Sequence, residues 1–265
     1  MSFDILRYRA ALTQCREDFI MHYPAEIAAF DQLDKVFPRY APALGHIPVV
    51  LQKHSFQLTP FLHVMQRRAR TAFEHLSARQ SSLAWIALRT FLESPLIIGK
   101  WIDDPQNAVI WNSRNTGKAA RKEYQDVYFG ESLRPRSLPG AEPIRNVLAR
   151  LDDDFIQTNP RYYARPIVFT QGGQRVSPDL ADDDADLRAH VYAVLHLIAF
   201  VLRSLGQLLS QQQGDKPDLK FDLEKLQREF GPAAEAIARQ NETHKAVLTN
   251  LGLWPHELLH RQHAR

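Results

Sequence analysis

The sequence predicts a predominantly α-helical protein, a multi-helix bundle with two enclosed core helices and one small β-hairpin. Residues 81–111 form an almost uninterrupted apolar run, and Leu187–Gln213 forms a second. In both, apolar residues occupy every side of the helical wheel, as in helices that other helices surround. The β-prone segment is PIVFTQGGQRV, in which Gly172-Gly173 can form a tight turn.

We expect a single helical domain over residues 1–265, in three parts. Residues 1–57 should form a helical hairpin, Asp4–Tyr23 and Ala25–Phe37, followed by an irregular connection, because Pro24 and Pro38 interrupt helices there. Residues 59–213 should hold the core helices, and residues 214–265 the C-terminal helices.

Two cap-plus-proline pairs predict helix starts within the core. In Thr59-Pro60 and Asp104-Pro105, a side-chain oxygen can accept hydrogen bonds from the free amide groups at a helix start, and proline suits the first helical position. The first helix should run to about Arg79. The second should run from Pro105 to about Phe129 without interruption.

The first apolar run is long enough to span a membrane, which takes about 20 residues. However, Arg89, Glu93 and Lys100 lie inside it, and each would cost roughly 2.5–3.5 kcal/mol near the bilayer centre. We therefore expect a buried core helix and no membrane span. With Cys15 as the single cysteine and no signal-peptide pattern at the start, a cytoplasmic location is expected.

The positive charge is concentrated in the first part of the chain. Residues 1–150 carry 20 Lys and Arg against 14 Asp and Glu, whereas residues 151–265 carry 13 against 16. A basic half can attract nucleic acid or acidic partners, or it can simply hold solvated helix faces that contact the acidic half. A candidate phosphate-facing stripe lies on one side of the expected helix 105–129: Arg114, Lys118, Arg121 and Lys122. It lacks the dense aromatic interleaving of a single-strand binder.

Charged and polar residues embedded in the apolar runs form a candidate buried network: Arg89, Glu93, His196 and Arg203. A charge in apolar surroundings is costly unless it is paired, so we expect Arg89 and Glu93 to neutralise each other or groups on a neighbouring helix. Removing one partner should cost about 3–5 kcal/mol. The set could instead line the floor of a pocket, because perturbed ionisable groups also gather at functional sites.

A second candidate site is Arg239 with His244, in the segment RQNETH. An arginine followed four to six residues later by a histidine is the pattern of helical ribonucleases of the HEPN class. There histidine would act as acid and base, and arginine would stabilise the charge on phosphorus. About three such pairs arise by chance at this composition, Arg70 with His75 among them, so a solvated helix face is the competing interpretation.

A third candidate is the C-terminal HELLH, in which His256 and His260 would bind zinc and Glu257 would activate water. The remaining downstream histidine is His263, and three rings so close together would crowd the metal. Adventitious metal binding and an ordinary amphipathic tail are the alternatives. No glycine loop for phosphates and no dinucleotide fingerprint is present, so we expect no cofactor.

The stretch ALRTFLESPLIIGKWIDDP, Ala87–Pro105, resembles the core of uncharacterised bacterial helical families of the DUF5677 type. The segment NPRYYARPIVF is similar in placement to their tyrosine-rich stretch. This resemblance implies an all-helical, HEPN-like fold, mostly without assigned activity, although some HEPN relatives are ribonucleases.

Three functions follow as hypotheses. The first is a helical module that binds a protein partner or forms a homo-oligomer. The second is an HEPN-like, metal-independent ribonuclease acting through Arg239 and His244. The third is a metal-dependent hydrolase centred on His256 and His260.

Overall fold

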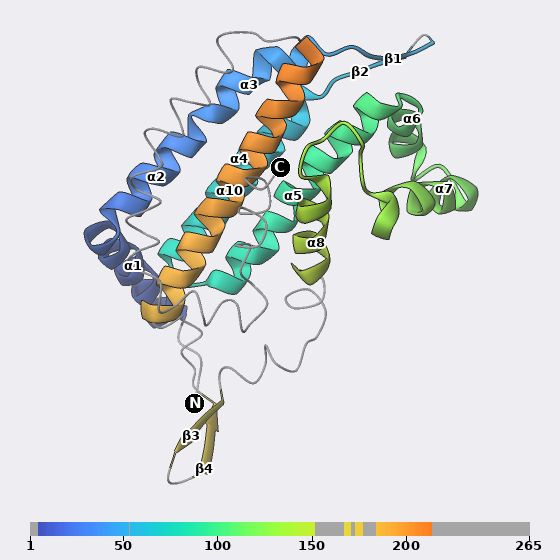
Figure 1. The fold of residues 1–265 in the computed structure, drawn as a ribbon. Helices are drawn as coiled ribbons and strands as arrows, with labels where there is room; N and C mark the ends of the chain where they lie inside the picture. The colour runs from blue at the N-terminus through green and yellow to red at the C-terminus, as the bar shows by residue number, and fades with distance from the viewer. Residues whose placement is uncertain (1–4, 53, 152–166, 171–172, 177–183, 214–265) are drawn as a thin grey trace.

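The protein is predominantly α-helical, as the sequence predicts (Figure 1). The structure, a computed structural model, describes residues 5–52, 54–151, 167–170, 173–176 and 184–213. The expected C-terminal helices over residues 214–265 therefore lie outside the described residues.

The helices of the first half are α1 (Ile5–His22), α2 (Pro24–Asp34), α3 (Val36–Gly45), α4 (Thr59–Ser77) and α5 (Ser81–Asp103). The later helices are α6 (Gln106–Ser113), α7 (Lys118–Tyr128), the 3-10 turn η1 (Gly130–Ser132), α8 (Ala141–Leu151) and α10 (Asp184–Gln213). The strands are β1 (Val49–Leu51), β2 (His54–Phe56), β3 (Ile167–Thr170) and β4 (Gly173–Val176).

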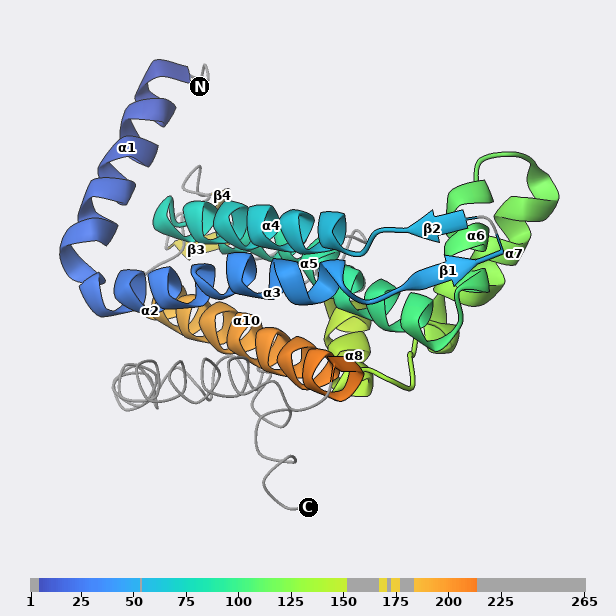
Figure 2. The same ribbon diagram turned by 90° about the horizontal axis from the view of Figure 1, so that it is seen from above.

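The core is built on α4, α5 and α10. A short turn that holds Arg79 at φ 58° joins α4 to α5, so the two helices pack in opposite directions. The helix α10 contacts α2, α3, α4 and α5, and α8 covers the C-terminal half of α5 (Figure 2). Both long apolar helices are thus enclosed by others, which is the arrangement that their apolar wheels predict.

Length and composition alone would let two helices cross a membrane. In those windows, within Ser81–Asp103 and His190–Gln212, 67% and 72% of the residues are buried inside the bundle. Core helices of soluble proteins, which are mostly buried, pass the same test of length and composition, so passing it is weak evidence for a span.

The first helix, α1, projects from the bundle, whereas α2 lies along it (Figure 2). Phe19 is the buried residue of α1; its ring stacks on Tyr23 with centroids 4.6 Å apart and meets Phe73 of α4 edge-on. The break at Tyr23 matches the prediction. The two helices do not lie side by side as a hairpin, because α1 makes its contacts mainly with the end of α4 and the start of α2.

The expected helix end at Phe37-Pro38 is wrong. The break falls at Lys35, and α3 continues through Pro38 and Pro42. Pro38 occupies the first turn of α3, where an amide hydrogen would have no partner within the helix in any case. Pro38 therefore belongs to the start of a helix and not to the end of one.

The connection after α3 is also more regular than expected. In place of an irregular segment, β1 and β2 form an antiparallel pair with Val49 opposite Phe56. The turn needs Gln52 at φ 53°, a conformation for which glycine or asparagine is the usual signal. The expected hairpin over residues 167–176 is confirmed, with Ile167 of β3 opposite Val176 of β4.

The expected continuous helix over residues 105–129 is two helices. The first of them starts as predicted: Asp104 Oδ1 accepts a hydrogen bond from the Gln106 backbone N–H at 2.9 Å. It stops at Ser113, where side chains bond to the last carbonyls of α6: Thr116 Oγ1 donates to Ser113 O at 2.7 Å. Gly117 then provides an extended residue before α7 begins.

Candidate functional site

The residues predicted to form a buried network lie in two separate groups. Arg89 Nη1 lies 3.0 Å from Glu93 Oε1, one helical turn apart on α5. Their side chains are 35% and 25% exposed, so the pair is not enclosed as we expected. Tyr124 of α7 lies near both charges, and its pKa is raised by burial first and by Glu93 second.

The other two members, His196 and Arg203, lie on a half-buried side of α10. The His196 ring contacts the ring of Tyr192 on its own helix, with centroids 4.1 Å apart. Among the described residues, no hydrogen bond or ion pair links them to Arg89 and Glu93. The four residues thus form no single site within the part of the chain that the structure describes.

A buried polar contact that the sequence did not reveal joins α5 to α10. Trp85 Nε1 donates to His190 Nδ1 at 3.1 Å, and both side chains are at most 1% exposed. His190 was recognisable as embedded in an apolar run, but its partner is 105 positions away. Nothing in the local pattern pairs the two.

The α6–α7 lobe, residues 106–129, projects from the bundle beside the end of α5 (Figure 1). A chain of hydrogen bonds holds it: Trp101 Nε1 donates to Tyr128 Oη at 2.9 Å, and that hydroxyl donates to the Asn107 carbonyl at 2.7 Å. Asn107 Nδ2 in turn donates to the carbonyl of Lys100 at 2.8 Å. Burial raises the pKa of the Tyr128 phenol, which keeps it a hydrogen-bond donor.

The predicted cationic stripe lies on this lobe but on two elements. Arg114 belongs to the break after α6, where its guanidinium stacks over the Trp111 ring at 4.5 Å from the centroid. It also donates to the Trp111 carbonyl at 2.6 Å. Lys118, Arg121 and Lys122 are exposed on α7.

Aromatic side chains lie beside these cations, contrary to the impression from the sequence. The Trp111 ring meets Tyr124 and Tyr128 edge-on, with centroids 5.5 and 5.2 Å apart. Phe129, which follows α7, meets Tyr124 edge-on and is 54% exposed. The bend at residues 114–117 brings them together, which a single straight helix would not do.

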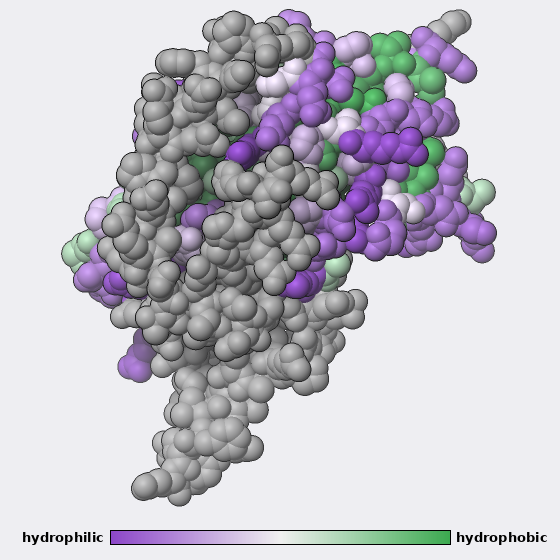
Figure 3. All heavy atoms as spheres, viewed as in Figure 1, coloured by the Kyte–Doolittle hydropathy of each residue, from purple (hydrophilic) through white to green (hydrophobic). Residues whose placement is uncertain are grey.

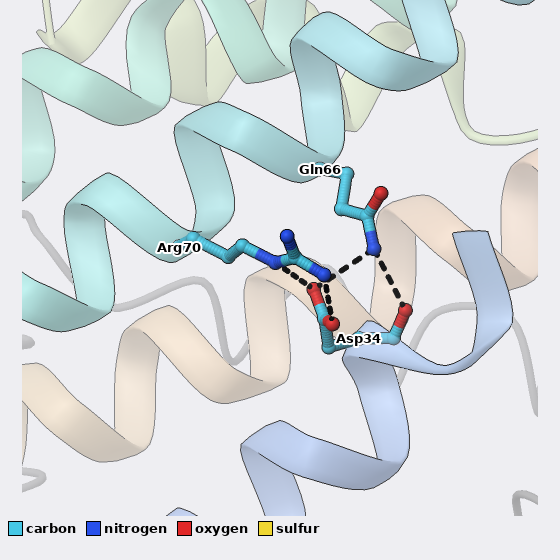
Figure 4. A network of polar contacts seen from close by, with 3 residues as sticks. All are labelled: Asp34, Gln66 and Arg70. Atoms are coloured by element: carbon cyan, nitrogen blue, oxygen red, sulfur yellow. Dashed lines mark hydrogen bonds and ion pairs between the residues drawn. The ribbon is translucent and has the colours of Figure 1, made fainter. Parts of the chain in front are cut away.

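Arg70, one member of a candidate ribonuclease pair, is engaged elsewhere. Its guanidinium grips Asp34, at the end of α2, through Nε at 2.8 Å and Nη2 at 2.7 Å (Figure 4). Gln66 donates to the same carboxylate at 3.2 Å. The hydrogen bonds that Arg70 donates to the Asp34 carboxylate raise the pKa of Arg70. His75 contacts Gln80 Oε1 and not Arg70. Arg70 therefore links α4 to the end of α2 through Asp34.

The outer surface of α1 is a further candidate site. Its exposed apolar side chains gather at both ends: Ile5 and Leu6 near the start, Ile20 and Met21 near the finish. The opposite side is held by Arg16, whose Nε lies 2.6 Å from Glu74, and by Tyr8, which accepts a hydrogen bond from Gln80 at 2.7 Å. This surface could not be predicted from the sequence, because the apolar residues of α1 are spread around the helix.

The remaining predicted site residues lie outside the described residues: Arg239, His244, His256, Glu257 and His260. Their roles in the ribonuclease and hydrolase hypotheses stay predictions. Within the described ranges, no three His, Cys, Asp or Glu residues come close enough to hold a metal ion.

Comparison with known proteins found no matching family model, no matching curated protein and no matching solved structure. The likeness to the DUF5677 type therefore stays a prediction.

Proposed function

We propose that this chain is a helical interaction module that self-associates through α1. The observation that carries the proposal is that α1 spans 18 residues and buries Phe19, while much of its apolar surface faces solvent. Leu6, Ile20 and Met21 are 72%, 64% and 65% exposed. A protruding helix with large exposed apolar residues is typical of an interaction surface.

One line of exposed residues runs the length of α1, besides exposed positions elsewhere on the helix such as Arg7, Gln14 and Met21. Positions 6, 10, 13, 17 and 20 recur every three or four residues, so they share the side opposite Tyr8, Leu12 and Phe19. The line reads Leu, Ala, Thr, Glu, Ile. Small residues at its centre allow a second helix to approach closely, and Leu6 and Ile20 can each cover a residue of that helix.

The charge distribution along α1 favours a second copy of α1 as its partner. Arg7 and Arg9 lie near the start of α1, and Glu17 and Asp18 lie near its end. Two copies of α1 are therefore complementary in charge when they run antiparallel, and they repel when parallel. In the antiparallel arrangement centred on Thr13, Leu6 faces Ile20 of the second copy. This is the self-complementary pairing that a two-fold symmetric dimer needs.

Light scattering coupled to size exclusion over a range of protein concentrations tests the proposal. The wild-type chain should shift from monomer to dimer as concentration rises, and Leu6→Arg/Ile20→Arg should stay monomeric throughout. The matched control is Val50→Arg/Val64→Arg, which alters two other exposed apolar residues and should still dimerise. A wild-type chain that stays monomeric, or a dimer that survives the α1 change, would overturn the proposal.

A further inference from the structure

We infer that the α6–α7 lobe binds single-stranded nucleic acid. The inference is independent of self-association, because the lobe lies at the far end of the bundle from α1 (Figure 2). Between Pro105 and Lys122 the chain carries four cations and no acidic residue. In Figure 3, hydrophilic side chains cover the lobe with hydrophobic atoms between them.

The cations of α7 lie in its first half, and its acids follow them along the chain. Lys118 is three and four residues from Arg121 and Lys122, so the three share one side of the helix. Tyr124 and Tyr128 turn toward the lobe interior, as their burial shows. Glu123 lies on the third side of the wheel, whereas Asp126, four residues after Lys122, borders the cationic side at its C-terminal end. The start of α7, residues 118–122, thus presents a short cationic strip that can contact a phosphate backbone.

Aromatic groups border this strip. Phe129 is 54% exposed at the end of α7, and its ring rests edge-on against Tyr124 with centroids 5.7 Å apart. Trp111 is partly exposed at the other end, with Arg114 stacked on its face at 4.5 Å. Both an open phenyl ring and a planar guanidinium present a flat surface on which a base can stack.

The lobe is also held firmly enough to present these groups. The hydrogen bonds from Trp101 to Tyr128 and from Tyr128 to Asn107 fix α7 against the end of α5. Ring contacts fix Trp111 against Tyr124 and Tyr128. A ligand would therefore meet a surface whose aromatic and cationic groups are already in place, which lowers the entropic cost of binding.

This combination favours a single strand over a duplex or an acidic peptide. In a duplex the bases are stacked on each other, so Phe129 would have nothing to stack on. An acidic peptide would form ion pairs with the cations, but its backbone and carboxylates would not stack on the aromatic groups. Single strands offer phosphates and unstacked bases together.

Fluorescence anisotropy with labelled oligo(dT) and oligo(U), at several salt concentrations, tests the inference. The charge variant is Lys118→Ala/Arg121→Ala/Lys122→Ala. The matched control, Lys35→Ala/Arg67→Ala/Arg68→Ala, removes the same charge from exposed positions on other elements. Phe129→Ala removes the exposed ring without touching charge. A duplex of the same length and a poly-glutamate peptide serve as competitors.

The charge variant should weaken oligonucleotide binding at least tenfold. It should also flatten the slope of log K against log salt by about 2, because each phosphate contact to a single strand contributes about 0.7. Phe129→Ala should weaken binding at least fivefold, and the control less than twofold. The inference is overturned if the wild type does not bind, if the control loses as much as the charge variant, or if the duplex or peptide competes as well as the single strand.

Discussion

The indole of Trp85 donates a 3.1 Å hydrogen bond to Nδ1 of His190, in the interior between α5 and α10. The two rings are also arranged edge-on, with centroids 6.3 Å apart. Because Nδ1 accepts this bond, it carries no proton, and the neutral ring must be protonated at Nε2. The contact specifies the register of α5 against α10, which the packing of apolar surface alone does not specify.

Replacing His190 with Leu should destabilise the protein by about 1–3 kcal/mol, because the buried Trp85 N–H loses its acceptor. Urea unfolding of His190→Leu, Trp85→Phe and the double variant measures this. Since the double variant leaves neither group unsatisfied, its loss should be smaller than the sum of the single losses. Strictly additive losses would show that the hydrogen bond contributes nothing to stability.

Glu26 should make stability fall as pH rises from acid to neutral. Its side chain is 6% exposed, and burial raises its pKa more than the backbone hydrogen bond and Arg188 lower it. The folded state thus binds this proton more tightly than the unfolded state does. The stabilising contribution is complete below the unfolded pKa of about 4.3 and is lost as pH rises through the folded pKa.

Glu26→Gln should therefore raise the melting temperature at neutral pH and change it little near pH 4, where the wild-type carboxyl is already neutral in the folded state. Thermal unfolding followed by circular dichroism across this range is the measurement. Glu123→Gln, at an exposed position, serves as the control and should leave the melting temperature nearly unchanged. A lower melting temperature for Glu26→Gln at neutral pH would mean that attraction to Arg188 outweighs the cost of burial.

Gly140→Ala should be more destabilising than Gly130→Ala. Both glycines have positive φ, 77° and 57°, which costs a side-chain residue about 1–2 kcal/mol. A Cβ at Gly140 would also lie 2.8 Å from the Phe200 ring and 2.9 Å from Ser204 Oγ, whereas Gly130 faces open space. The clash should add about 1–3 kcal/mol in denaturant unfolding. Equal losses at the two positions would contradict this close approach to α10.

Arg89→Met should cost no more than about 1 kcal/mol, well below the 3–5 kcal/mol of a fully buried pair. Arg89 and Glu93 are 35% and 25% exposed, so water can solvate the carboxylate that is left behind. The melting temperature of Arg89→Met against that of Glu93→Gln checks this. A loss of several kcal/mol in either variant would show that the pair is more enclosed than its exposure indicates.

Local signals predicted the elements whose causes are local. The helix starts near Thr59-Pro60 and Asp104-Pro105 were predicted, and the apolar wheels of α5 and α10 predicted their burial. Asp104 caps its helix as expected, whereas Thr59 is the first residue of α4 and makes no capping hydrogen bond. The prediction failed at Pro38, since the same residue type is compatible with the first turn of a helix and with the residues just after one. It failed at residues 114–117 because side chains there compete for the carbonyls that would continue α6.

The candidate surfaces were less predictable than the fold. The cations Lys118, Arg121 and Lys122 could be placed on one helix face from their spacing. Their aromatic neighbours Trp111 and Phe129 could not, because that proximity depends on the bend before α7. The exposure of α1 likewise depends on how the other helices pack, and this cannot be predicted from the local sequence of α1.

The central claim is the antiparallel pairing of α1, and a charge exchange tests it most directly. One variant carries Arg7→Glu/Arg9→Glu and the other Glu17→Arg/Asp18→Arg. Each alone should be monomeric in sedimentation equilibrium, because like charges then meet across the pair. An equimolar mixture should form a heterodimer as readily as the wild type forms a homodimer. A mixture that stays monomeric while the wild type dimerises, or single variants that dimerise normally, would contradict the claim.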